Sequence, residues 1–309
     1  MESNMTSGVV LVTGAAGGSQ GQTGRQVSEL LLAQGVTVRA FVRKIDHRSE
    51  RLRALGAEVI EGDFLDYHSV ARATQGVSSV YFAYPVQEGL LEATAIMADA
   101  AQKAGVTRLI DMVMLVSSPD APTPRMRENY LSERIFEWAG IGAAHVRATL
   151  FYENIRALTR ATIARDGSIL LPWGSESTLV PLVSAQDVAG VAVGLLTSPS
   201  LRPGSSFPVI GDVLTLRDIL ATFQQVLGRS VRYQEVPDKA WADVALSHGF
   251  NQHAVEHLSK LWQALRAGTG TYEIPDTILK LAGKSPKTFE EFLQEQKDAF
   301  QPQFASASA

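Results

Sequence analysis

Cysteine is absent from the 309-residue sequence. Its absence excludes disulfide bonds, cysteine nucleophiles and metal sites built on thiolates. A chain without cysteine also suits a reducing compartment, and we expect the protein to be cytoplasmic.

Long apolar runs and a strong charge imbalance are also missing. No uninterrupted apolar segment reaches the about 20 residues that a membrane-spanning helix needs. The first residues, MESNMTS, lack the basic region and apolar core of a signal peptide. The formal net charge of −4 disfavours nucleic acid, since phosphate contacts require a basic surface. We therefore expect neither a membrane nor a nucleic acid as partner.

Short apolar runs alternate with helical patterns in the first half of the sequence. Helical periodicity marks Gly24–Gln34 and Gly89–Lys103. We expect strands at Val9–Thr13, Thr37–Val42, Ala57–Glu61, Ser79–Ala83, Arg108–Ser117 and Ala143–Leu150. Strands that alternate with helices of this length are typical of βαβ units on a parallel sheet. The pattern predicts an α/β fold, a doubly wound parallel sheet of the Rossmann type.

The pattern changes after Phe151. The turn Arg165–Ser168 precedes a short strand, Ile169–Leu171. Two sequences, Ser184–Asp187 and Thr215–Asp218, fit the capping box that starts a helix. Shorter strands and new helix starts indicate a second, less regular part of the chain.

Two domains are expected from this change. A nucleotide-binding domain would cover residues 1–154, and a smaller α+β lobe on the substrate side would cover residues 155–309. A strand and a helix, at about residues 180–210, are expected to return to the sheet of the first domain.

Two motifs share the glycine-rich segment Gly8–Val27, which reads GVVLVTGAAGGSQGQTGRQV. Residues 17–21 match the G-x-S-x-G elbow of a hydrolase, with Ser19 as the nucleophile. Such an elbow borrows an oxyanion-hole amide from a loop after an earlier strand, and no strand precedes this one. None of the six histidines has an evident reason to reach Ser19 as its base. We therefore expect Ser19 to do no covalent chemistry.

A dinucleotide-binding fingerprint fits the same segment better. Gly14 ends the first strand, Gly17 allows close approach to a pyrophosphate, and Gly24 lets the next helix pack on the strand. Seven positions separate Gly17 from Gly24, where a tight fingerprint has three. We interpret Gly18–Gly21 as a four-residue insertion. A flexible loop without a ligand is the alternative.

The end of the second strand indicates which cofactor binds. NAD-specific sites place an acidic residue there for the ribose 2′-hydroxyl, whereas this sequence has Arg43 and Lys44. An arginine binds a 2′-phosphate through a fork of hydrogen bonds, and a lysine adds a point charge. We therefore predict NADPH as the cofactor. The alternative is a solvated basic turn, because Arg48, Arg51 and Arg53 follow.

Five segments carry a family resemblance. They read VLVTGAAG, VRAFVRK, VIEGDFLD, AGVTRL and WAGIGAAHVRATLFYEN. Together they resemble the NmrA-like family of atypical short-chain dehydrogenases/reductases. The resemblance covers residues 8 to about 195 well and the remainder loosely. It is specific for the family and not for any substrate.

The resemblance implies a cofactor site assembled from loops at the strand ends. The pyrophosphate would lie against Gly14, Ala16, Gly17, Gln22, Thr23 and Gly24, and the 2′-phosphate against Arg43 and Lys44. The adenine would lie near Asp63 and Phe64, the ribose near Ala83, Tyr84 and Pro85, and the nicotinamide near Phe151, Tyr152 and Asn154. Phe151 and Tyr152 have an alternative role as ordinary core aromatics.

Catalytic groups are less clear. Short-chain dehydrogenases use a Tyr-x-x-x-Lys pair, and the nearest match is Tyr130 followed by Arg134. Family members often carry a lysine just before this helix, where Asn129 stands. Tyr130 is our candidate proton donor, and a helix with surface charges is the alternative. Ser117, near the end of the fifth strand, would bond a substrate carbonyl or merely begin a turn.

A histidine pair in the second half offers another motif. His253 and His257 fit the H-x-x-E-H zinc signature, and one helical turn would separate them. No third ligand motif is evident, so we expect a solvated helix face and no metal.

These observations favour an NADPH-dependent reductase of a small organic acceptor, such as a quinone, enone, imine or carbonyl. The substrate would bind in a cleft between the two lobes, and a homodimer is left open. The alternative is a non-catalytic NADP(H)-binding redox sensor that regulates a protein partner, because the expected lysine is missing. The identity of the substrate is not in the sequence.

Overall fold

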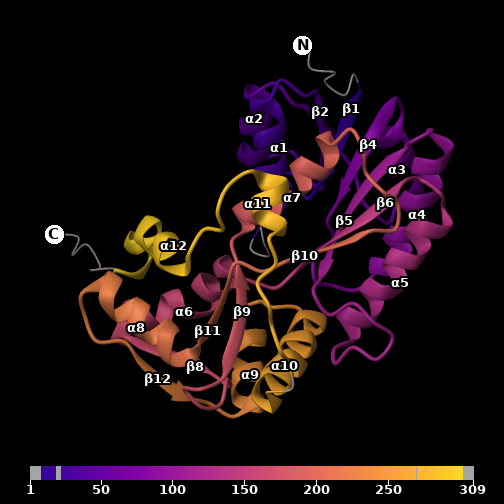
Figure 1. Cartoon of the computed structure of the whole chain (residues 1–309). Helices are drawn as coiled ribbons and strands as arrows, with labels where there is room; N and C mark the ends of the chain where they lie inside the picture. The colour runs from indigo at the N-terminus through magenta and orange to yellow at the C-terminus, as the bar shows by residue number, and fades with distance from the viewer. Residues whose placement is uncertain (1–7, 19–21, 269, 302–309) are drawn as a thin grey trace. The chain divides into compact units, whose positions relative to one another are not determined.

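The fold divides into two compact units, shown in the computed structural model of Figure 1. The structure describes residues 8–18, 22–268 and 270–301. The first unit comprises Met1–Thr149, Ala185–Val209 and Pro275–Ser285. The second comprises Leu150–Ser184, Ile210–Ile274 and Pro286–Ala309. The chain therefore crosses between the units more than once, and residues 150–154 belong to the second unit.

A seven-stranded parallel sheet forms the centre of the first unit. Its strand order is β10-β6-β5-β4-β1-β2-β3. The strands are β1 (Val9–Thr13), β2 (Val38–Val42), β3 (Glu58–Glu61), β4 (Val77–Phe82), β5 (Arg108–Met114), β6 (Ala143–Ala148) and β10 (Ser206–Val209). The order reverses between β1 and β4, which is the switch point where such sheets bind ligands. The predicted doubly wound α/β fold is confirmed.

Helices cover both faces of this sheet. They are α1 (Thr23–Ala33), α2 (His47–Ala54), α3 (Tyr67–Thr74), α4 (Leu90–Lys103), α5 (Pro124–Trp138), α7 (Ala185–Thr197) and α11 (Thr277–Ala282). Figure 1 shows α1, α7 and α11 on one side of the strands and α3, α4 and α5 on the other. Burial on both faces explains why the central strands read as continuous apolar runs, as in β1 with Leu11 and Val12 fully buried.

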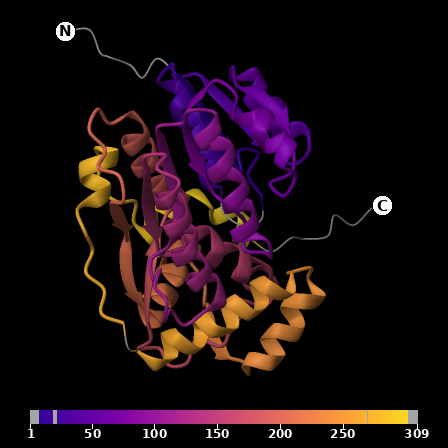
Figure 2. The ribbon, with the colours of Figure 1, turned by 90° about the vertical axis from the view of Figure 1, so that its right-hand side faces the viewer.

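The second unit is built from shorter elements. Strand β9 (Leu179–Val183) pairs antiparallel with β11 (Asp212–Thr215) and parallel with β7 (Leu150–Phe151), and β8 (Ser168–Leu171) pairs with β12 (Arg232–Glu235). The helices are α6 (Tyr152–Asp166), α8 (Leu216–Leu227), α9 (Asp238–Ser247), α10 (Gln252–Ala267), α12 (Phe289–Glu295) and the 3₁₀ turn η1 (Lys297–Phe300). Helices α9 and α10, in orange tones, lie side by side in both views (Figures 1 and 2).

Local signals explain several of these boundaries. The Thr215 hydroxyl accepts the Asp218 amide at 3.1 Å, and the Asp218 carboxylate accepts the Thr215 amide at 2.9 Å. This capping box starts α8 as predicted. Within the described ranges of the chain, no helix is long and apolar enough to cross a membrane.

Candidate nucleotide site and catalytic groups

Glycines shape the described part of the loop between β1 and α1. Gly14 and Gly17 adopt positive φ values of 62° and 67°, and the Gly17 amide donates to the Gly14 carbonyl at 3.0 Å. A Cβ at Gly24 would lie 2.4 Å from the Thr13 carbonyl oxygen, so helix and strand approach too closely for any side chain. The N-cap residue of α1, Gln22, makes no side-chain cap. Gln22 therefore does not occupy the first amides of α1, which in a helix lack partners within the helix itself.

The hydrolase hypothesis depends on residues 17–21, which carry the G-x-S-x-G motif. Ser19, with the rest of segment 19–21, lies outside the described residues. Ala16 is half-buried in the turn before it, and Thr23 is buried in the first turn of α1. Among the described residues no strand precedes β1, which argues against an elbow at Ser19.

Two cations stand at the end of β2. Arg43 and Lys44 are exposed, and neither makes an ion pair or a side-chain hydrogen bond with any residue that the structure describes. Arg48, Arg51 and Arg53 differ, because each pairs with a carboxylate. Arg43 and Lys44 are thus the cations of this turn without a carboxylate partner among the described residues. Their predicted role in place of a ribose-binding acid stays a prediction.

Arg48 is a residue that sequence reasoning missed. Its Nη1 donates to the Gly17 carbonyl at 2.8 Å, and its Nη2 lies 2.6 Å from the Asp46 carboxylate. Hydrogen bonds from the side chain and the amide of Arg48 lower the pKa of Asp46 to about 2. Arg48 thus joins the glycine loop to the start of α2. The sequence feature that could have indicated this role of Arg48 is Asp46, an N-cap residue two positions before it.

The predicted ribose segment is joined to β1 at the switch point. The Thr13 hydroxyl accepts the Ala83 amide at 2.8 Å and donates to the Ala83 carbonyl at 3.3 Å. Tyr84 is buried, and its hydroxyl donates to the Glu88 carbonyl at 2.9 Å. Pro85 follows directly, so the segment leaves β4 beside the glycine loop.

The predicted adenine residues have different surroundings. Asp63 is exposed and accepts the Leu65 amide at 2.9 Å. The Phe64 ring packs edge-on against three other rings, which belong to Phe41, Phe82 and Tyr84. Phe64 therefore stabilises the strand ends, and its predicted contact with adenine stays a prediction.

A buried arginine holds the segment after β4. Arg125, in the first turn of α5, is 3% exposed. Its Nη2 donates to the Tyr84 carbonyl at 2.8 Å and its Nη1 to the Gln87 carbonyl at 3.3 Å. Burial lowers the pKa of this guanidinium to about 10. No sequence motif singled it out, because its partners lie about 40 positions earlier in the chain.

The predicted nicotinamide residues all lie in the second unit. Tyr152 is fully buried, and its hydroxyl donates to the Asp212 carboxylate at 2.7 Å and to the Lys287 carbonyl at 3.0 Å. The alternative of a core aromatic thus describes its side chain. Phe151 and Asn154 are half-buried. A role beside the nicotinamide stays a prediction for these three residues.

Helix α5 presents the candidate catalytic groups. The Arg134 guanidinium lies 5.5 Å from the centre of the Tyr130 ring, and it pairs with Glu137 at 2.5 Å. It therefore sits over the ring face and is already bound to a carboxylate. Asn129 was expected just before the helix that carries Tyr130, but α5 begins at Pro124 and contains Asn129. The side-chain oxygen of Asn129, the residue found where a lysine was expected, accepts a hydrogen bond from the Met114 amide at the end of β5 at 3.3 Å.

Ser117 lies just beyond β5 and is 6% exposed. Its Oγ is buried and has no hydrogen-bond partner in the part of the chain that the structure describes. A serine that only began a turn would bond the local backbone. Its isolation favours the other role, contact with a ligand, and that role stays a prediction.

A buried ionic cluster beneath α5 was not anticipated. Asp111 and His145 lie side by side on β5 and β6, with His145 Nε2 3.2 Å from Glu137. Glu133 accepts two hydrogen bonds from Arg147, at 2.9 and 2.6 Å. Burial raises the pKa of Asp111. Burial alone would lower the pKa of His145, but the neighbouring carboxylates raise it above the ordinary value. The sequence did contain one indication of this cluster: Glu133 and Glu137, four positions apart, lie on the same face of a helix.

The histidine pair of α10 differs from the expected solvated face. His257 is buried, whereas His253 is half-buried. Among the described residues, no group of three histidine, aspartate or glutamate side chains is arranged to hold a metal ion.

Comparison with known proteins identifies the family. A profile of the NmrA-like family matches residues 6–293. The chain belongs to this family. Over 302 residues the NmrA-like chain is 30% identical to the (4-alkanoyl-5-oxo-2,5-dihydrofuran-3-yl)methyl phosphate reductase of Streptomyces griseus subsp. griseus. The match covers 96% of this chain and all of the relative.

Two solved structures share the NmrA-like fold. An NADPH-dependent quinone oxidoreductase from Escherichia coli, complexed with NADPH, has a TM-score of 0.79 and 23% identity, over 94% of this chain and 99% of that one. NmrA, a negative transcriptional regulator, in complex with NAD, has a TM-score of 0.77 and 19% identity, over 93% and 94%. The same fold thus occurs in a reductase and in a regulator.

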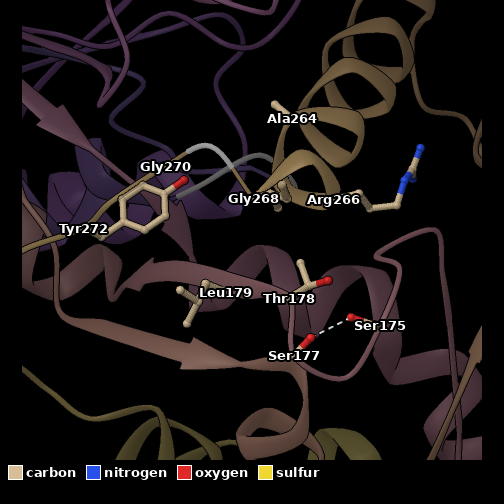
Figure 3. A pocket seen from close by; sticks show the side chains of 10 residues that line it. Ser175, Ser177, Thr178, Leu179, Ala264, Arg266, Gly268, Gly270 and Tyr272 are labelled. Carbon is tan, nitrogen blue, oxygen red and sulfur yellow. Dashed lines mark hydrogen bonds between the residues drawn. The ribbon is translucent and has the colours of Figure 1, made fainter.

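The second unit of this NmrA-like protein contains a cavity. Its volume is about 250 Å³, and it opens between the start of β9 and the end of α10. Figure 3 shows Thr178 and Leu179 on one side, Tyr272 across from them, and the Arg266 side chain directed away. Arg266 instead pairs with Asp238 at 2.7 Å. None of the predicted cofactor or catalytic residues lines this cavity.

Proposed function

We propose that this protein is an NADPH-dependent reductase of a small conjugated acceptor, an enone or a quinone. The observation that carries the proposal is the pair of exposed cations, Arg43 and Lys44, which make no ion pair with any described residue and lie one strand away from the glycine turn. A 2′-phosphate is the part of NADPH that such a pair would neutralise.

The described residues fit NADPH at the switch point of the sheet. Gly14, Gly17 and the start of α1, where the Gln22 side chain makes no cap, would receive the pyrophosphate. Arg48 would keep the glycine loop beside the 2′-phosphate site through its contact with the Gly17 carbonyl. When bound, the reduced nicotinamide would supply a hydride.

The chain itself would orient the acceptor and would offer few polar groups to take part in the reaction. Arg134 is paired with Glu137, and Asn129 closes β5, so neither would assist Tyr130 as a lysine does. Catalysis would then depend mainly on holding the acceptor close to the hydride. Acceptors whose product anion is already stabilised, such as enones and quinones, suit such a site better than simple ketones.

The relatives support this acceptor class. The name of the Streptomyces griseus relative describes a dihydrofuran ring that carries an oxo group and an alkanoyl group, so its double bond is conjugated with carbonyls. The Escherichia coli structure of the same fold is a quinone oxidoreductase. Both acceptors are conjugated carbonyl compounds.

The test is NADPH consumption with a panel of quinones, enones, imines and simple ketones. We expect turnover with the conjugated members. We expect Tyr130→Phe to lose much less activity than the about 10²–10⁴-fold that is lost when a general acid is removed. Activity confined to simple ketones and abolished in Tyr130→Phe would overturn the proposed acceptor class.

A second function, an NADP(H) sensor that regulates a protein partner, is favoured by one observation. The position of the expected lysine is taken by Asn129, whose oxygen is occupied by the Met114 amide. NmrA, a regulator, has the same fold. Tight NADPH binding without turnover of any member of the panel would favour the sensor over the reductase.

A further inference from the structure

Two hydroxyl groups without partners lie at the carboxyl edge of the parallel sheet. Ser117 follows β5 and Thr149 follows β6, and they are 6% and 9% exposed. Neither Ser117 Oγ nor Thr149 Oγ1 has a hydrogen-bond partner within the described residues. Strands β5 and β6 are neighbours in the sheet, so both hydroxyls belong to one short stretch of its edge.

The pairing of the strands defines this stretch. The register of β5 and β6 ends at Met114 and Ala148, and one further bond joins the Leu115 amide to the Ala148 carbonyl at 2.8 Å. Thr149 comes next, and its amide lies 3.4 Å from the Val209 carbonyl of β10. Its backbone is therefore held from one side by the sheet.

The direction of Thr149 follows from the alternation of side chains along β6. Residues two positions apart point to the same face of a strand. Arg147, two positions earlier, reaches Glu133 of α5 with its guanidinium. Thr149 therefore points to the face that α5 covers, the face that also carries Asp111 and His145.

Many other buried hydroxyls of the first unit are bonded, although the hydroxyl of Tyr81 in β4 also has no partner among the described residues. Ser28 donates to the Gly24 carbonyl at 2.9 Å, Thr94 donates to the Leu90 carbonyl at 2.8 Å, and Thr13 bonds Ala83. Buried polar groups are almost always satisfied, and exceptions require an explanation. Two exceptions at the ligand-binding edge of one sheet indicate a ligand atom that accepts from both.

We propose that Thr149 and Ser117 together bind the carbonyl oxygen of the acceptor, with Thr149 as the second donor. The inference rests on the proposed function, since it assigns the polar partner of that same reaction. Two hydroxyl donors stabilise an oxygen that becomes negative, and they do so without giving up a proton. This site takes the place of the missing tyrosine–lysine pair.

The electron balance shows where the two hydroxyls act. The acceptor takes a hydride from the reduced cofactor at the carbon β to its carbonyl, where a C–H bond forms. The C=C pair then moves to the bond between the α-carbon and the carbonyl carbon, and the C=O pair moves onto oxygen. The enolate oxygen accepts hydrogen bonds from Ser117 and Thr149. Water protonates the α-carbon, and the products are the saturated carbonyl, the oxidised cofactor and hydroxide.

The first test is the steady-state reduction of 2-cyclohexenone by Thr149→Val, which keeps the shape of the side chain and removes the hydroxyl. We expect kcat/KM to fall on the order of 10²-fold, as when one oxyanion donor is lost, with unchanged NADPH affinity. Ser117→Ala should behave in the same way. Thr107→Val is the matched control, because Thr107 is exposed just before β5, at the opposite edge of the sheet.

The second test needs no turnover. 4-Nitrophenol is bound in the presence of NADP⁺, and its ionisation is followed by absorbance against pH. The wild type is expected to bind the phenolate preferentially, which lowers the pKa of the bound phenol below that of the free phenol. In Thr149→Val this pKa should rise by about one unit, a tenfold weaker preference for the anion.

The outcomes separate this inference from the proposed function. Wild-type turnover and phenolate spectra that Thr149→Val leaves unchanged would overturn the inference and leave the reductase intact. Absence of NADPH binding in calorimetry, or of turnover, would overturn the proposed function and this inference with it. A tenfold change in phenolate preference that Thr107→Val does not reproduce would support the two-hydroxyl site.

Discussion

At the scale of single residues, charge pairing separates binding residues from structural ones. The five cations of segment 43–53 look alike in the sequence. In the structure Arg48, Arg51 and Arg53 have carboxylate partners, and exposed pairs of this kind contribute little to stability. Arg43 and Lys44 remain available to a ligand.

Replacement of Arg43 tests the choice of cofactor. We expect Arg43→Ala to weaken NADPH binding by about ten- to a hundredfold, because a charge-assisted hydrogen bond contributes about 1.5–3 kcal/mol. NADH affinity should hardly change, since NADH lacks the 2′-phosphate. Isothermal titration calorimetry with both cofactors measures this difference. Arg53→Ala is the control, because Arg53 is exposed and pairs with Glu50. Equal losses for the two cofactors would contradict the assignment.

At the scale of elements, α5 is fastened to the sheet by polar contacts. Asn129, Glu133 and Glu137 are four positions apart, and they contact the Met114 amide, Arg147 and His145 in turn. The ion pair between the buried Glu133 and Arg147 is weak evidence for stability, because the cost of removing the charges from water offsets their attraction. Its geometry still fixes the register of the helix that carries Tyr130.

The protonation of His145 makes this attachment depend on pH. The pKa of His145 is raised in the folded protein above its ordinary value of 6.5 by the carboxylates of Asp111, Glu133 and Glu137. A group with a raised pKa contributes stability that is fully present below pH 6.5 and is lost as pH rises through the folded-state value. Asp111, whose pKa burial raises, acts in the same direction. We therefore expect the contribution of His145 to the free energy of unfolding to decrease as pH rises above 6.5.

Urea unfolding of His145→Gln at several pH values measures this effect. The variant should be less stable than the wild type below pH 6.5, and the difference should shrink as pH rises. His47→Gln is the control, since His47 is exposed at the start of α2. A stability difference that does not vary with pH would show that His145 stays neutral in the folded protein.

At the scale of the whole molecule, each unit is assembled from segments far apart in the sequence. Helix α11, residues 277–282, packs against α7 of the first unit, although it follows most of the second unit in the sequence. Gly194 allows this approach, because a Cβ there would lie 2.1 Å from the Leu281 carbonyl oxygen. A backbone atom at this distance cannot move aside as a flexible side chain can.

Gly194→Ala should therefore destabilise the first unit, although Gly194 lies outside the predicted cofactor-binding segments. Overpacking of this kind costs about 1–3 kcal/mol. Urea denaturation gives the free energy of unfolding, and Gln186→Ala is the control because Gln186 is exposed on the same helix. A stability equal to that of the wild type would show that α11 is displaced at little cost.

The sequence by itself determined what local pattern and backbone conformation dictate. Alternating apolar runs predicted the strands of the parallel sheet, and Gly14, Gly17 and Gly24 predicted a turn that the structure shows to need glycine. These signals are local, because strand alternation and φ depend on neighbouring residues.

Only the tertiary structure decided which polar groups have partners. It paired three of five similar cations, placed Tyr152 in the core and formed the cluster around His145. It also left the hydroxyls of Ser117 and Thr149 without partners among the residues that the structure describes. Each outcome depends on atoms brought together from distant positions, such as Tyr152 with Asp212. A hydrogen bond or an ion pair is a property of two positions, and the sequence names the residue at each without saying which two will meet.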